Sequence, residues 1–250
     1  MRAAFFFPVI FAALLLASAP AAALKLLPFK AAIIAVPEAA AQSGAVQVFR
    51  LENNTNGAVA VEVYAETWDV DENGQETNQS ARAEFSIFPA QLVLPPRESR
   101  AVRVVWRGAV PAQEKPFRLV AAQLPVDLKN AATDAAAVRF LLRFKAALYI
   151  RPAAAVKSDI RAEEARLLPD GRLRLTLHNH GSAHAVLHGA RLSLTLAGGG
   201  RAELGSDVLK PLEGENIHAG RRRIFVLPRP PQLSANAEIA RGAFAYDGKF

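Results

Sequence analysis

The stretch that decides the fold is Val138–Ile150, VRFLLRFKAALYI, which reads as one long β-strand. It is about twice the length of an ordinary strand and would extend about 43 Å at about 3.3 Å per residue. Large apolar side chains point to both of its faces, and three cations, Arg139, Arg143 and Lys145, are spread along it. A strand this long, apolar and basic is costly to leave at a sheet edge. We therefore predict that it pairs with a strand of another chain, and that its cations fix where that chain begins.

Short alternating runs bounded by turn residues lie on both sides of this strand, and no long helical period interrupts them. The runs before it are Leu26–Val36, Ala45–Leu51, Val59–Trp68, Phe85–Leu94, Ala101–Trp106 and Phe117–Leu124. Those after it are Glu164–Leu168, Leu173–His178, Val186–Leu196, Ile224–Leu227 and Ala237–Tyr246. This spacing is typical of immunoglobulin-like sandwiches. We predict an all-β protein of two such sandwiches, over residues 24–152 and 153–250, joined after Arg151-Pro152.

The first residues, Met1–Ala23, have the pattern of a secretory signal peptide. Arg2 supplies the charged start, Phe5–Ala17 is a continuous apolar run, and Ala21-Ala22-Ala23 offers small residues for cleavage. A membrane anchor is the alternative, but the apolar run is shorter than the roughly 20 residues that a spanning helix needs. We predict a mature chain that is secreted or periplasmic and does not insert into the membrane.

Composition excludes several classes of function. The chain has no cysteine, which in an oxidising compartment removes both disulfides and thiol catalysis. Its net charge of +7 favours acidic partners or carboxylate groups, but the cations are not clustered as a nucleic-acid surface requires. No nucleophile motif, phosphate-binding loop or pair of catalytic acids is present. We predict a protein that is not an enzyme, binds no nucleic acid and needs no cofactor or metal.

Three segments resemble the first domain of the periplasmic pilus-assembly chaperones, the PapD-like family of the chaperone–usher pathway. They are FSIFPAQLVLPPRESRAVRVVWRG at Phe85–Gly108, EKPFRLVAAQLP at Glu114–Pro125 and RFKAALYIRP at Arg143–Pro152. Leu173–Leu196 is similar to the opening of the second domain. The resemblance implies two immunoglobulin-like sandwiches in an L shape. It also implies a chaperone that holds pilin or fimbrial subunits and passes them to an outer-membrane usher.

In this family the chaperone lends its long strand to complete the sheet of a subunit that lacks one, which is strand addition at an exposed edge. Val138, Phe140, Leu142 and Phe144 alternate along the strand and point to one face. We predict these four as the donor residues and assign Leu141 and Leu148 to the core. In the alternative, a bulge reverses the parity and the four predicted donors face the chain's own core.

The family also binds the carboxylate at the subunit's C-terminus with cations in its cleft, where charge-assisted hydrogen bonds fix the register. Lys30, in Pro28-Phe29-Lys30, takes the place of the first family cation. The second is a lysine four residues before the Arg-Pro pair, where this chain has Ala147, and this departure suggests a divergent archaic or alternative branch. Arg118 and Arg143, followed by Lys145, are the expected anchors. A solvated surface charge is the alternative for each.

The resemblance implies an interdomain ion cluster as well. Arg151 matches its arginine, Glu114 a carboxylate ahead of the sixth strand, and Asp247 the third member. Such a cluster would fix the angle between the two domains.

Two other functions stay open at this point. One is a secreted immunoglobulin-like adhesion or structural module, which would have no reason to expose a long basic strand. The other is a periplasmic metal carrier that uses His178, His180, His184 and His188, because imidazole suits zinc and copper. No carboxylate or cysteine completes a metal-binding pattern near these histidines in the sequence.

Overall fold

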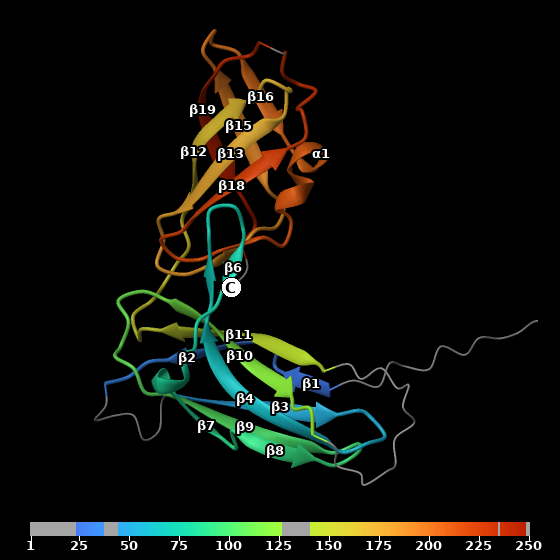
Figure 1. The fold of residues 1–250 in the computed structure, drawn as a ribbon. Helices are drawn as coiled ribbons and strands as arrows, with labels where there is room; N and C mark the ends of the chain where they lie inside the picture. Colours follow the sequence, from blue (N-terminus) through green and yellow to red (C-terminus); the bar gives the residue numbers. More distant parts are fainter. Residues whose placement is uncertain (1–23, 38–44, 127–140, 235, 249–250) are drawn as a thin grey trace, which may run out of the picture.

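A computed structural model describes residues 24–37, 45–126, 141–234 and 236–248, and within these ranges the chain is nearly all β-structure (Figure 1). The second sandwich stands on one end of the first, which confirms the predicted pair of immunoglobulin-like sandwiches in an L shape. The predicted signal peptide Met1–Ala23 and the predicted donor residues Val138 and Phe140 lie outside the described residues. Among the described residues, no helix is long and apolar enough to cross a bilayer.

The first domain packs a four-stranded sheet, in the order β1-β3-β9-β7, on a five-stranded sheet, in the order β2-β11-β10-β4-β8. Its strands are β1 (Leu24–Leu27), β2 (Lys30–Ile34), β3 (Val46–Asn53), β4 (Val59–Thr67), β7 (Phe85–Phe88), β8 (Gln91–Leu94), β9 (Ser99–Trp106), β10 (Lys115–Gln123) and β11 (Arg143–Arg151). A short 3-10 turn, Arg82–Glu84, precedes β7. The layer that contains β10 and β11 lies on the side of the second domain (Figure 1).

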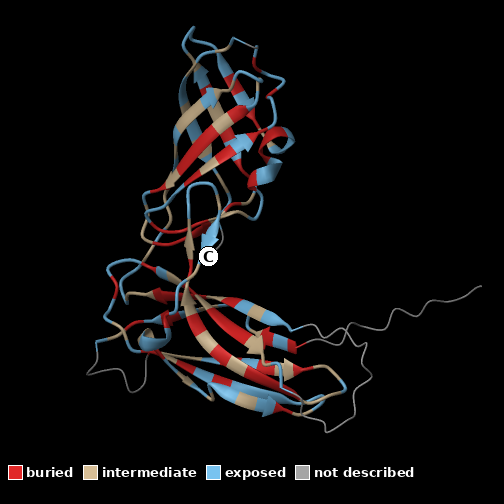
Figure 2. Ribbon diagram, viewed as in Figure 1, coloured by how far each residue is buried: buried red, intermediate tan, exposed pale blue. Residues whose placement is uncertain are grey.

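Alternation along each strand builds the core between these sheets, because every second side chain points inward. In β4, Val59, Val61, Val63 and Ala65 are buried on one face. The rings of Phe85, Trp106 and Phe117 meet at centroid distances of 5.1 to 5.4 Å near one end of the core. Figure 2 shows the buried residues concentrated along the facing strands of each sandwich.

In the first domain, two runs predicted as single strands are each divided between the two sheets, so the sequence boundaries there were wrong. Leu26–Val36 separates at Pro28 into β1 and β2, and Phe85–Leu94 separates at Pro89 into β7 and β8. Proline has no N–H to donate to a ladder, so the chain leaves one sheet at that position and joins the other. The first switch places Lys30 beside β11.

The second domain has its own core and three small sheets, in the orders β12-β13-β18, β16-β15-β19 and β14-β17. Its strands are β12 (Ile160–Leu167), β13 (Leu173–Asn179), β14 (Ala185–Val186), β15 (Arg191–Leu196), β16 (Arg201–Leu204), β17 (Asn216–Ile217), β18 (Arg222–Leu227) and β19 (Ile239–Ala245). The short helix α1 (Ser206–Leu209) and a 3-10 turn, Lys210–Leu212, follow β16. The run Val186–Leu196, predicted as one strand, is divided between β14 and β15, which belong to different sheets. Neither β16 nor α1 was predicted, because each is only 4 residues long.

A hairpin made of β5 (Asp69–Val70) and β6 (Glu76–Thr77) extends from the first domain to the second (Figure 1). Asp71 shapes its tip, where one carboxylate oxygen accepts the backbone N–H groups of Asn73 and Gln75 at 2.9 and 2.8 Å. At that tip the Ile224 N–H of β18 donates to the Glu72 carbonyl at 2.7 Å. The hairpin therefore rests on an edge strand of the second domain.

Candidate functional site

The strand β11 is covered along its whole length on one side and along only part of its length on the other. β10 pairs with it antiparallel from Ile150 back to Arg143. β2 pairs with it in parallel only from Ala147 to Arg151. In the described part of the chain, no strand pairs with Arg143–Ala146 on the β2 side. Their backbone groups form an open edge at the end of the strand nearest the predicted donor segment.

One face of β11 belongs to the core of the first domain. Ala146, Leu148 and Ile150 are buried there, and Phe144 is partly buried and packs against the same cluster. The assignment of Leu148 to the core is therefore confirmed. Leu141, by contrast, is 50% exposed, so its predicted place in the core was wrong.

Leu142 has the same parity as Phe144 but precedes the first residue of β11 and is 36% exposed. Side chains of this one parity are thus exposed at Leu142 and packed against the protein's own core from Phe144 onward. Whether such a side chain faces the core or is exposed therefore depends on its position along the strand. Phe144, which was predicted as a donor, already contacts the protein's own core.

On the opposite face of the sheet, the predicted anchors lie on three neighbouring strands, β2, β11 and β10. In register, Ala147 lies opposite Arg118 of β10 on one side and opposite Lys30 of β2 on the other. Arg118 in turn lies opposite Glu66 of β4. Paired residues share a face, and each strand spacing is about 4.8 Å, so Lys30 and Arg118 stand about 10 Å apart with a small side chain between them. The family lysine missing at Ala147 is thus flanked by two cations on neighbouring strands.

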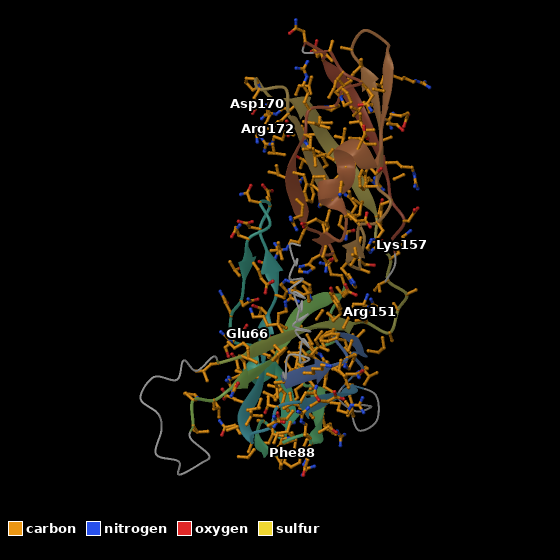
Figure 3. All side chains as sticks on the ribbon, turned by 90° about the vertical axis from the view of Figure 1, so that its right-hand side faces the viewer. Glu66, Phe88, Arg151, Lys157, Asp170 and Arg172 are labelled. Carbon is orange, nitrogen blue, oxygen red and sulfur yellow. The ribbon has the colours of Figure 1, made fainter. Side chains whose placement is uncertain are left out.

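Two carboxylates neutralise three of these cations. Arg118 Nη2 donates to Glu76 Oε2 at 2.8 Å, and Arg143 Nη2 donates to Glu66 Oε1 at 3.0 Å. Lys145 Nζ lies between the two carboxylates, 3.6 Å from Glu66 Oε2 and 3.5 Å from Glu76 Oε1. The three predicted anchors therefore gather on one face, close to Glu66, which Figure 3 labels.

Glu76 comes to this cluster from β6 of the hairpin. Partial burial alone would raise its pKa, but the hydrogen bond from Arg118, a second from Asn78 and the charges of Arg118 and Lys145 outweigh that effect. Together they lower the pKa of Glu76 from 4.5 to about 2. Arg118 also lies over the ring of Trp68, with Cζ 3.4 Å from its centroid. Lys30, in contrast, is exposed and has no carboxylate partner among the described residues.

The junction of the two domains is built around Glu114, which is 3% exposed. Arg151 Nε donates to its Oε2 at 2.6 Å, and its Oε1 accepts the backbone N–H of His184 at 2.8 Å and bonds His184 Nδ1 at 2.6 Å. Burial raises the pKa of Glu114, but these hydrogen bonds and the charge of His184 prevail and lower it. Figure 3 labels Arg151 where the two domains meet.

Aromatic contacts extend this junction. Tyr149 stacks on His184 with ring centroids 3.9 Å apart, and its hydroxyl accepts a hydrogen bond from Asn216 at 2.8 Å. Trp68 meets His218 edge-on at 4.5 Å. Burial, the largest influence, together with the nearby charge of His184, lowers the pKa of His218 to about 3, so its ring is neutral at physiological pH. The domains are thus joined by a buried polar network with aromatic rings packed around it.

The structure brings two members of the predicted interdomain cluster together and leaves the third apart. Glu114 and Arg151 form the ion pair, but Asp247 follows β19 and pairs with Arg191 at 2.9 Å on the exposed surface of the second domain. His184 takes the third place. Sequence reasoning missed it because it stands 70 positions from Glu114 in a histidine-rich turn. No local pattern marks it as a partner.

The sequence was compared with known families and structures. Residues 36–156 match the family described as pili and flagellar-assembly chaperone, PapD N-terminal domain. No curated protein sequence matches the chain.

Several solved structures share the two-domain fold. A chain of the CsuC–CsuE chaperone–tip adhesion subunit pre-assembly complex, from the archaic chaperone–usher Csu pili of Acinetobacter baumannii, is 15% identical with a TM-score of 0.56, covering 87% of this chain and 97% of that one. The E. coli chaperone DraB is 16% identical with a TM-score of 0.55, covering 88% and 96%. A chain of the Salmonella enterica SafA pilin–SafB chaperone complex is 15% identical with a TM-score of 0.55, covering 92% and 98%.

Proposed function

We propose that this chain, which belongs to the PapD-like family of pilus-assembly chaperones, holds pilin or fimbrial subunits by donor-strand complementation and delivers them to an outer-membrane usher. Chaperones of this family act in the periplasm and are not enzymes. The observation that carries the proposal is the open edge of β11 at Arg143–Ala146, which lies beside a row of cations.

Strand addition at this edge follows from simple physical requirements. An unpaired row of N–H and C=O groups favours pairing with an extended chain, and the backbone ladder supplies affinity without demanding a sequence. Alternate side chains then provide specificity. Leu142 is exposed and in line with the core face of β11, which supports its proposed role as a donor that enters a subunit's groove. Val138 and Phe140 continue the same parity and remain predicted donors.

The cation row suggests how a subunit's terminal carboxylate is anchored. A carboxylate above Ala147 would lie between Lys30, which has no partner in the described chain, and Arg118. Arg118 is held by Glu76 in the free protein, so the incoming carboxylate must displace Glu76. Arg143 and Lys145 lie farther toward the open edge and would attract the subunit's chain along it. In this proposal, the Glu76 carboxylate of the hairpin binds Arg118 until a subunit's carboxylate replaces it.

Two of the similar structures are complexes whose partners are, by their descriptions, a tip adhesion subunit and a pilin. We infer the same class of partner for this chain. We also infer that Met1–Ala23 directs it to the periplasm, where an usher receives the complex. A secreted adhesion or structural module remains the competing function, and it would protect no subunit.

The test is co-expression of the chain with a pilin-like subunit encoded beside it, followed by protease digestion of the purified complex. We expect the subunit to co-purify and to resist digestion. Arg118→Ala should weaken capture strongly, because the subunit's carboxylate would lose a partner at a cost of about 2–5 kcal/mol. Arg100→Ala, an exposed arginine paired with Glu98 on the opposite sheet, is the matched control. A subunit that is equally stable without the chain would refute the chaperone assignment.

A further inference from the structure

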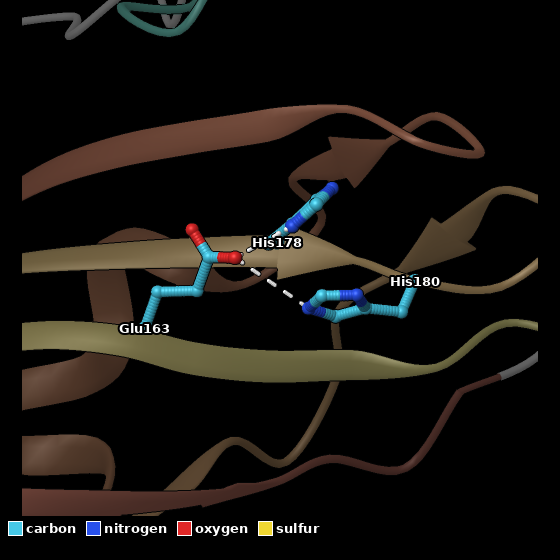
Figure 4. Close-up of side chains that lie close together, drawn as sticks. All are labelled: Glu163, His178 and His180. Atoms are coloured by element: carbon cyan, nitrogen blue, oxygen red, sulfur yellow. Dashed lines mark hydrogen bonds and ion pairs between the residues drawn. The ribbon is translucent and has the colours of Figure 1, made fainter.

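A second cluster of chemistry-bearing side chains lies on the other domain, away from the cation row. Glu163 of β12 meets His178 of β13 and His180 just beyond it (Figure 4). Glu163 Oε1 is 2.7 Å from His178 Nδ1 and 3.5 Å from His180 Nε2. The two imidazole rings are tilted by 47° with centroids 4.0 Å apart. Three potential ligand atoms thus lie within 4.8 Å of one another.

A β-bulge brings the carboxylate to the histidines. Arg161 pairs with His178 and Glu164 pairs with Thr176, and the register shifts between Ala162 and Glu164. Glu163 is the additional residue of β12 in that interval, and such a residue is turned away from regular alternation. The sequence gives no sign of this encounter, because the glutamate precedes His178 by 15 positions and has no metal-binding spacing to it.

We propose that Glu163, His178 and His180 form a binding site for a divalent transition-metal ion that favours imidazole, with Zn²⁺ as the representative ion. Zinc takes imidazole nitrogen and carboxylate oxygen at about 2.0–2.2 Å, and two His ligands with one Glu form a known ligand set for it. Tetrahedral coordination requires ligand atoms about 3.3 Å apart. The 3.5 Å separation satisfies this, and the 2.7 Å hydrogen bond must open by about half an ångström when the ion replaces the shared proton.

Arg222 of β18 orients the carboxylate. Its Nε donates to Glu163 Oε2 at 2.6 Å and its Nη2 approaches Oε1 at 3.3 Å. Hydrogen bonds of this kind commonly orient metal ligands. The positive charge of Arg222 also repels a divalent cation. The charge of the nearby Arg161 is balanced by Asp159, with which it pairs at 2.6 Å. The positive charge of Arg222 therefore weakens the affinity of the site for a divalent cation. The side chain of His180 is 38% exposed, which leaves the fourth coordination position open to solvent or to a ligand from another molecule.

The experiment is calorimetric titration of Zn²⁺ into the metal-free chain purified without a histidine tag. We expect one ion per chain, and at least about tenfold weaker binding for His178→Ala, His180→Ala and Glu163→Gln. His188→Ala is the matched control, because His188 also bonds a carboxylate, Glu213, at 2.6 Å, but among the described residues no third ligand is grouped with them.

Circular dichroism melting establishes that each variant is folded. His180 follows the last residue of β13, so its replacement tests the site even if changes within the strands disturb them. The proposal is overturned if the wild-type chain takes up no stoichiometric zinc. It is equally overturned if His180→Ala binds zinc as the wild type does, or if His188→Ala weakens binding to the same degree. Because neither the open edge of β11 nor the cation row is involved, the outcome is independent of the chaperone proposal.

Discussion

The Glu114→Ala variant should uncouple the two domains without unfolding either core. Glu114 accepts bonds from Arg151 Nε, His184 Nδ1 and the His184 backbone N–H, at 2.6, 2.6 and 2.8 Å. Removal of one partner from a buried charged network costs about 3–5 kcal/mol. The Arg151 side chain is 22% exposed and can turn toward water, so we expect a loss near 3 kcal/mol. Neither hydrophobic cluster contains these residues, so the loss should fall on the junction.

The chain's two tryptophans allow this to be measured. Trp106 lies in the first core, whereas Trp68 lies at the junction against His218 and Arg118. In a Trp106→Phe background, fluorescence reports the environment of Trp68 alone. We expect urea to shift this signal at a much lower concentration in Glu114→Ala than in its parent, ahead of the loss of β-structure seen by circular dichroism.

Glu98→Ala provides the control, because Glu98 forms an exposed ion pair with Arg100 at 2.9 Å. Such a pair contributes about 0–1 kcal/mol. If Glu114→Ala shifts the Trp68 transition no more than Glu98→Ala does, the reasoning about the junction is refuted. A single transition seen by both probes in Glu114→Ala would show that the two domains still unfold as one unit. In that case loss of the Glu114 network does not uncouple them.

Three further predictions concern pH, the anchor and the donor segment. Because the pKa of Glu76 is lowered from 4.5 to about 2, its contribution to stability is full above pH 4.5 and is lost as the pH falls toward 2. The difference in Tm between wild type and Glu76→Gln should therefore shrink on acidification, and a constant difference would contradict this. The same substitution should strengthen subunit binding about fivefold, since a partly exposed ion pair of about 1 kcal/mol no longer competes for Arg118. Glu98→Gln is the control, and weaker binding by Glu76→Gln would argue against displacement. Leu142→Asp should impair subunit capture without changing the Tm. Phe144→Asp should instead lower the Tm, because it buries a charge against the core. An equal loss of Tm in both variants would show that Leu142 also packs in the core.

Much of the fold could be predicted because strand alternation is a local property. The runs Val59–Trp68, Phe117–Leu124 and Leu173–His178 reappear as β4, β10 and β13 with small changes at their ends. The runs at Leu26–Val36 and Phe85–Leu94 were misjudged, because alternation continues across a proline while the partner sheet changes. Composition alone does not reveal which sheet a strand joins.

The cations of the candidate site could also be selected from the sequence, since Lys30, Arg118, Arg143 and Lys145 stand in or beside apolar strands. Their partners could not. Glu76 reaches Arg118 across 42 positions, and only a hairpin that leans on the second domain brings it there. Whether a cation is available or already neutralised therefore depends on contacts between distant segments.

The sequence by itself determined that the chain is all-β, divided into two sandwiches, and marked by a basic apolar segment ahead of Arg151-Pro152. These properties follow from periodicity, proline and charge, which act along neighbouring residues. Only the tertiary structure decided that His184 replaces Asp247 beside Glu114, that Glu163 joins the two histidines, and that one face of β11 changes from core to exposed surface at Leu142. Each depends on strand pairing, a bulge or the end of a sandwich, and these place side chains by three-dimensional register rather than by separation along the chain.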